Sequence, residues 1–330
     1  MFENLEYKNN GRDLSIEELK KFTSFCLALS RNGIRTRMIF RGENYQSLKE
    51  KLSLYGNNDF NKLNALIFLI GEKGRVYRKE YKKKITNKKK IHTIDSVETG
   101  LFKYIFHKLN SILTKKKKKE EIKQFKSNNI NLDEYFSNKE NITDFLTKVS
   151  STKNRQEKIR IRDYYLNLLH QIGGIGFYNN SFFISTTRDI KVAEEFASNS
   201  KNSEKIIFIS WVNCPMNQVG VTFNYLNKFN KSILNLALPT YSKSFFPKQK
   251  EVSIKGGLLP HYILGYIRVE KKELTVNPNL FTTNRDFNGI IKNGFEIDQS
   301  NFNNAINETD YSGYFILDEN DIYTDINKSP

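Results

Sequence analysis

The sequence predicts an α+β protein whose strand-rich core is interrupted by a large, basic helical insertion. Three observations support this prediction. Apolar residues recur at helical spacing in several long segments. Short runs of β-branched and aromatic residues, bounded by turn residues, occur on both sides of those segments. Most of the net charge of +17 is concentrated in the helical part of the 330-residue chain, which is long enough to bury a sizeable core.

The first 70 residues should supply a helix and the first strand of the core. Ser15 and Glu18 have the spacing of a capping box, and apolar residues follow at helical spacing. Alternation and β-forming residues predict a strand over 34–41. Two further helices are expected over 45–54 and 60–70.

Residues 71–170 form the predicted helical insertion, with helices over 101–112, 132–148 and 156–171. Residues 73–126 hold 19 Lys/Arg against 5 Asp/Glu, a net charge of +14. Such a concentration favours a polyanionic partner, which can be nucleic acid, an anionic membrane surface or an acidic protein, although charge runs are also typical of solvated surfaces. The nucleic-acid-binding residues that we predict are Lys82, Lys83, Lys84, Lys88, Lys89, Lys90, Lys115, Lys116 and Lys117.

Residues 171–276 should complete the strand-rich core, and residues 277–330 form an acidic, Asn-rich tail. Residues 271–330 hold 5 Lys/Arg against 10 Asp/Glu. A helix with an acidic start is expected over 189–197, where Thr187 or Asp189 can cap it. Strands are expected over 182–184, 205–211, 234–238, 251–255 and 262–270.

Several classes of protein are excluded by what the sequence lacks. It contains no phosphate-binding loop motif, no nucleophile elbow and no Cys/His cluster with zinc-ligand spacing, so we expect no bound metal. It also lacks an apolar run of membrane-spanning length and an N-terminal apolar signal segment. We therefore expect a soluble, cytoplasmic protein without a membrane partner. The four histidines are expected to be surface or core residues: His92, His107, His170 and His261.

Three separated pieces of sequence form one pattern. A strand ends in Phe40-Arg41-Gly42, a second ends in Ser185-Thr186-Thr187 before a helix, and Gln249-Lys250-Glu251 opens a third. In this order the pieces resemble the R-S-E class of ADP-ribosyltransferases, in its Q-x-E branch. The resemblance implies two small packed sheets around an NAD+ cleft with N-terminal helices, built from residues 1–70 and 171–276. One departure is that Ser253 interrupts the hydrophobic strand that follows the glutamate in the family.

The chemistry of ADP-ribose transfer explains why these residue types are needed. NAD+ is the substrate, and Arg41 can bind its diphosphate bidentately. Gly42 lets the backbone approach the nicotinamide amide, and Ser185 with Thr186 completes the predicted NAD+ site. Glu251 can stabilise the oxocarbenium-like ribose, as carboxylates do in glycoside chemistry, while the Ser185 hydroxyl holds that carboxylate in place. We therefore predict Arg41, Ser185, Gln249 and Glu251 as catalytic residues.

Gln249 bears on the acceptor. Two residues before Glu251 on an extended chain, it should point to the same side. Q-x-E members of the family act on acceptors other than arginine, including guanine in nucleic acid in the pierisin-like branch. With the basic segment, this favours nucleic acid, RNA more than DNA, as the acceptor.

The chain also resembles ADP-ribosyltransferase toxins of bacterial toxin–antitoxin phage-defence systems, which implies an antitoxin protein as partner. Two alternatives remain open. One is an ADP-ribosyltransferase that modifies a protein, and the other is a basic nucleic-acid-binding protein without enzymatic activity.

Overall fold

The chain divides into two compact units, a sheet unit and a helical unit. The sheet unit comprises Met1–Lys84, Ser185–Gly220 and Ile254–Pro330, and the helical unit comprises Ile85–Ile184 and Val221–Ser253. The helical unit thus includes a segment that lies far beyond residue 170. In this computed structural model the described residues are 4–9, 11–31, 36–45, 48, 64, 67–68, 97–115, 120–173, 183–198, 204–213, 220–221, 226–227, 230–241, 247–255, 258, 263–282, 315–317 and 323–325.

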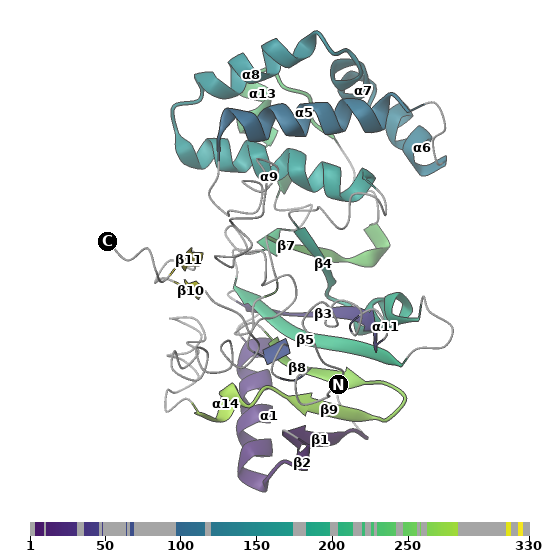
Figure 1. Ribbon diagram of the computed structural model, residues 1–330, viewed down its shortest axis with the longest axis vertical. Coiled ribbons are helices and arrows are strands. Elements are labelled where there is room, and N and C mark those ends of the chain that lie inside the picture. Colours follow the sequence, from purple (N-terminus) through teal and green to yellow (C-terminus); the bar gives the residue numbers. More distant parts are fainter. Residues whose placement is uncertain are drawn as a thin grey trace. The chain divides into compact units, whose positions relative to one another are not determined.

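The chain is an α+β protein, as predicted (Figure 1). The described helices are α1 (Ile16–Arg31), α5 (Thr99–Leu113), α6 (Glu120–Asn128), α7 (Ile130–Ser137), α8 (Asn141–Ser151), α9 (Arg155–Ile172), α11 (Ile190–Ala197), α13 (Asn230–Asn235) and α14 (Asn279–Thr282), with a 3-10 turn η4 (Pro247–Gln249). The described strands are β1 (Glu6–Asn9), β2 (Arg12–Asp13), β3 (Thr36–Asn44), β4 (Phe183–Thr187), β5 (Lys205–Asn213), β6 (Gly220–Val221), β7 (Glu251–Lys255), β8 (Ile263–Arg268), β9 (Glu273–Val276), β10 (Phe315–Leu317) and β11 (Tyr323–Asp325).

Among the described strands, nine form one sheet in the order β2-β1-β9-β8-β5-β3-β4-β7-β6. β1 and β9 are parallel, whereas β3, β5, β8 and β9 pair antiparallel in succession. β3 and β5 pair along their whole length, with Arg41 opposite Phe208. The expectation of two separate small sheets is corrected because one residue pair, Phe40 with Thr187, joins β3 to β4 and makes the strand order continuous.

The sheet unit has its core where α1 and α11 pack against β3. The predicted first helix is confirmed, and its residues Phe22, Phe25 and Leu29 are buried at helical spacing. Ile16 and Leu19, in the first turn, are exposed instead of joining this apolar face. The predicted strands over 205–211 and 262–270 are confirmed as β5 and β8, whereas the helices over 45–54 and 60–70 lie mostly outside the described residues.

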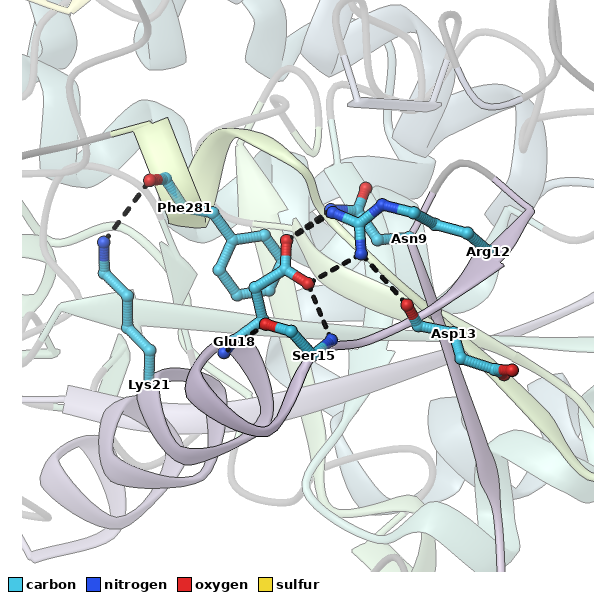
Figure 2. Close-up of polar contacts among 7 residues, drawn as sticks. All are labelled: Asn9, Arg12, Asp13, Ser15, Glu18, Lys21 and Phe281. Carbon is cyan, nitrogen blue, oxygen red and sulfur yellow. Dashed lines mark hydrogen bonds and ion pairs between the residues drawn. The ribbon is translucent and has the colours of Figure 1, made fainter.

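The start of α1 contains the predicted capping box (Figure 2). The Ser15 backbone N–H donates to Glu18 Oε2 at 2.9 Å, and the Glu18 N–H donates to Ser15 Oγ at 3.2 Å. The Arg12 guanidinium also donates to both carboxylate oxygens of Glu18, at 2.8 and 2.6 Å. These Arg12 hydrogen bonds lower the pKa of Glu18 from its ordinary value of 4.5 to about 2. The network therefore links β2 to the helix that follows it.

In the helical unit, α5 packs against α7, α8 and α9, and their apolar side chains form a continuous core (Figure 1). The helices predicted over 101–112 and 156–171 are confirmed as α5 and α9. The single helix predicted over 132–148 is wrong, because the chain forms α7 and α8 with a break between them. Asn110 of α5 donates to the carbonyls of Phe136 and Ser137, at 2.8 and 3.0 Å, and so satisfies acceptors at the end of α7.

The strand predicted over 234–238 is also wrong. This segment contains the end of α13 and a turn in which Ala237 has a φ of 49°. Ile233 and Leu238 are buried in the core of the helical unit, and the Tyr165 hydroxyl donates to the Pro239 carbonyl at 2.8 Å. Contacts with α9 therefore override the local β-propensity of this segment.

We expect Glu18→Gln to lower the free energy of unfolding by about 1 kcal/mol at pH 7, because it weakens the capping box and the ion pair with Arg12. A carboxylate with a lowered pKa stabilises the fold above its unfolded pKa and loses this effect as pH falls through its folded pKa. The difference between wild type and variant should therefore shrink between pH 4.5 and about 2. Urea unfolding measured across this range tests the prediction.

Glu17→Gln is the matched control, because Glu17 lies in the same first turn and is exposed. Its effect on the free energy of unfolding should be smaller. An equal loss in both variants would show that the helix dipole, and not the capping network, accounts for the effect.

Candidate functional site

Arg41 and Ser185, two of the predicted catalytic residues, meet in the sheet unit. Arg41 Nη1 donates to the Ser185 carbonyl oxygen at 2.7 Å, across 144 positions of sequence. The Arg41 side chain is 19% exposed. This hydrogen bond connects β3 to β4. Arg41 therefore has a structural role in addition to its predicted binding of diphosphate.

Glu43 is a partner of Arg41 that lies outside the R-S-E pattern. Arg41 Nη2 forms an ion pair with Glu43 Oε1, and the Glu43 side chain is 10% exposed. Residues two apart on a strand face the same side, so the R-x-E spacing of β3 was the signal that could have identified this pair. Any anion that binds Arg41 must therefore do so beside a buried carboxylate.

Gly42 lies on the opposite face of β3, against α11. A Cβ at this position would lie 1.7 Å from the Ala193 carbonyl oxygen and 2.8 Å from the Ala197 nitrogen. The close packing of strand and helix backbones therefore requires glycine here, independently of any approach to nicotinamide. The predicted role in NAD+ binding stays a prediction.

The predicted helix after Ser185-Thr186-Thr187 is confirmed as α11. Asp189 is its N-cap and accepts from the Lys191 N–H at 3.1 Å, while Thr187 Oγ1 accepts from the Asp189 N–H at 3.0 Å. Thr186 is buried and Ser185 half-buried. These caps fix the point at which β4 ends and therefore the position of Ser185.

Glu251, the predicted catalytic carboxylate, begins β7 in the helical unit. His170 Nε2 lies 3.0 Å from Glu251 Oε1, and Ser253 Oγ donates to the same oxygen at 3.1 Å. The Glu251 side chain is 15% exposed, whereas that of His170 is 2% exposed. Ser253, which interrupts the apolar residues of β7, therefore has a defined polar function here. The other predicted NAD+-site residues belong to the sheet unit: Arg41, Gly42, Ser185 and Thr186.

His170 was expected to be a surface or core residue, and it is buried in α9. Asn167 lies one turn before His170 on the same side of the helix, and Asn167 Nδ2 donates to Ser253 Oγ at 3.1 Å. Burial, with smaller contributions from Tyr164 and Glu251, raises the pKa of Tyr241 well above its ordinary value. The Tyr241 hydroxyl therefore stays protonated at neutral pH and donates to Asn167 Oδ1 at 3.2 Å. Polar residues at helical spacing among the apolar residues of the second half of α9, over 164–172, were the signal for this network.

Gln249 and Glu251 do not lie on one extended chain, so the expected geometry of the Q-x-E piece is wrong. Gln249 ends the 3-10 turn η4, and Lys250 has a φ of 46° before β7 begins at Glu251. The left-handed backbone at Lys250 interrupts the strand alternation that would have placed the two side chains on the same side. For a non-glycine residue this conformation costs about 1 kcal/mol or more, so the surrounding structure must hold it.

The predicted nucleic-acid-binding lysines lie almost entirely outside the described residues. Lys115, two residues after the end of α5, is described and exposed, whereas the other eight lie in undescribed segments. Within the described ranges, no group of three His, Cys, Asp or Glu side chains could hold a metal ion. No helix in the described part of the chain has both the length and the apolar character needed to cross a membrane.

Comparison of the chain with protein-family models, curated proteins and solved structures found no match.

We expect Gly42→Ala to lower the free energy of unfolding by about 3 kcal/mol, because its Cβ would collide with the backbone of α11. Gly100→Ala is the matched control: nothing lies within 4 Å of a Cβ at position 100, in the first turn of α5. That change should stabilise the helix by about 0.5–1 kcal/mol. Thermal or urea unfolding of both variants tests the pair, and a neutral Gly42→Ala would contradict the close packing of β3 on α11.

Proposed function

We propose that the protein is an NAD+-dependent mono-ADP-ribosyltransferase that transfers ADP-ribose to nucleic acid, with RNA the favoured acceptor. In this proposal it acts as a toxin in bacterial phage defence and is held inactive by an antitoxin protein. Arg41, Gly42, Ser185 and Thr186 bind NAD+, Glu251 stabilises the transition state and Gln249 contacts the acceptor.

The observation that carries the proposal is the hydrogen bond from Arg41 to the Ser185 carbonyl. The sequence pattern selected these two residues from segments 144 positions apart, and they lie in contact within one unit. The residues were selected by sequence pattern alone, and the pairing of β3 with β4 at Phe40 and Thr187 brings them together. The contact supports the pattern as a functional unit, while the third member, Glu251, is supported by its buried hydrogen-bonding partners.

The side chains present suit the chemistry of NAD+. The Arg41 guanidinium suits a diphosphate, and a carboxylate such as Glu251 suits a ribose hydroxyl and a developing positive charge. In the reaction the bond between ribose C1′ and the nicotinamide nitrogen breaks, and its electron pair leaves with neutral nicotinamide. A lone pair of the acceptor forms the new bond to C1′, and the acceptor gives up a proton to solvent.

The acceptor is proposed from charge. Residues 73–126 carry a net charge of +14, which suits the phosphate backbone of a nucleic acid. Incubation of a cell lysate with the protein and NAD+ labelled in its adenylate part tests the acceptor class directly. Label that is released by ribonuclease supports RNA, whereas label released by deoxyribonuclease or by protease identifies DNA or protein as the acceptor.

We expect Glu251→Gln to reduce ADP-ribose transfer by about 100–1,000-fold while leaving NAD+ affinity nearly unchanged, because the amide keeps the shape of the side chain but not its charge. Transfer kinetics and calorimetric titration with NAD+ measure the two effects separately.

Glu195→Gln, a change at an exposed position of α11, is the matched control and should keep full activity. If Glu251→Gln retained wild-type transfer, Glu251 would not be the catalytic carboxylate. If the wild-type protein bound RNA but never consumed NAD+, the non-enzymatic alternative would replace the proposal.

Neutralising Lys82, Lys83 and Lys84 to Gln should weaken RNA binding about equally for all sequences and flatten its salt dependence, because contacts with phosphate act through counterion release. The control, which removes the same charge, replaces the exposed residues Lys20, Lys271 and Lys272. Filter binding at several salt concentrations gives the slope. Equal slopes in the two triple variants would show that the lysine cluster does not contact RNA.

A further inference from the structure

We propose that His170 is a positioning residue for Glu251: its buried imidazole donates a hydrogen bond from Nε2 and fixes the orientation of the carboxylate. The inference rests on the proposed function and deepens it, because it assigns part of the catalytic machinery to α9. No residue of the R-S-E pattern lies in α9.

The geometry places two donors on one carboxylate oxygen. His170 Nε2 and Ser253 Oγ lie 3.0 and 3.1 Å from Glu251 Oε1. The terminal torsion of a glutamate is soft, so a carboxylate without such contacts samples a broad range of orientations. Two hydrogen bonds to Oε1 restrict that rotation before substrate binds.

Three successive hydrogen bonds run in one direction toward Glu251. Gln171 Nε2 donates to Asn167 Oδ1 at 2.9 Å, Asn167 Nδ2 donates to Ser253 Oγ at 3.1 Å, and the Ser253 hydroxyl donates to Glu251. An ionised carboxylate accepts hydrogen bonds and donates none, so it is the natural end of this chain. Because the carboxylate has no proton to donate, the contact between His170 and Oε1 can be a hydrogen bond only if the proton is on Nε2 of His170. Oε1 then accepts from both Ser253 and His170.

The imidazole is itself held in place. The His170 side chain is 2% exposed, and its ring meets that of Phe183 edge-on with centroids 5.9 Å apart. Gly173, which follows α9, donates from its N–H to the Leu169 carbonyl and closes the last turn. The side chain therefore cannot reach a substrate in solution, and its effect must pass through Glu251.

Replacement of His170 by leucine tests the proposal, because it removes the donor and keeps an apolar side chain in the core. We expect kcat for transfer to fall about 10–100-fold, with KM for NAD+ changed by less than about threefold. His170→Gln, whose amide nitrogen can take the place of Nε2, should restore most of kcat. His107→Leu, the same change at an exposed position of α5, should leave activity unchanged.

A double variant separates positioning from a structural role. In the Glu251→Gln background, His170→Leu should cause no further loss of the residual activity, because a positioning residue acts only through its partner. An equal loss in both backgrounds, without rescue by His170→Gln, would overturn the proposal. If His170→Leu does not fold, Ser253→Ala provides the second variant, and it should also lower kcat with little change in KM.

Nitrogen-15 NMR of labelled histidine gives a readout that does not depend on activity. The chain has four histidines, and His170→Gln identifies the signals of position 170. We expect a proton on Nε2 of His170, and an imidazole protonated only on Nδ1 would overturn the proposal.

If His170→Leu is fully active while Glu251→Gln is inactive, the positioning role alone is wrong. If the wild-type protein neither transfers ADP-ribose nor hydrolyses NAD+, the proposed function fails, and the positioning role fails with it.

Discussion

The sheet unit depends on the close approach of β3 and α11 at Gly42. The absence of a Cβ lets the backbone of β3 lie directly against the Ala193 carbonyl. The same strand pairs along its whole length with β5, so its register and its two faces are fixed together. With one face occupied by α11, the alternation of the strand turns Arg41 and Glu43 to the opposite face. The position of the candidate NAD+-binding arginine is thus a consequence of backbone packing.

Arg41 and Glu251, the two charged residues of the proposed function, both form hydrogen bonds with other residues of the protein. Arg41 pairs with Glu43 and donates to the Ser185 carbonyl, while Glu251 accepts from Ser253 and, in our proposal, from His170. Charges that are already oriented need little reorganisation when charge develops in a transition state. The cost is paid in folding, since ionised groups of low exposure are stable only when they are hydrogen-bonded.

The parts of the fold that the sequence predicted correctly are those in which local signals and tertiary contacts agree. The capping box of Ser15 and Glu18 and the periodic apolar face of α1 need only neighbours within one helix. The errors lie where a distant side chain changes the local outcome. Asn110 donates to the carbonyls at the end of α7, where the expected single helix is interrupted. Contacts with α9 override the β-propensity of residues 234–238.

The sequence by itself determined the α+β class, the helix and strand periods, and the identity of Arg41, Ser185 and Glu251 as one candidate pattern, because period and residue type are local properties. The tertiary structure alone decided which side chains form hydrogen bonds and ion pairs with Arg41 and Glu251. Glu43 could be inferred only weakly from its spacing, and the contact of His170 with Glu251 could not be inferred, since the two residues lie 81 positions apart. The left-handed backbone of Lys250 was equally hidden, because a strained conformation is imposed by surrounding packing and leaves no mark on residue type.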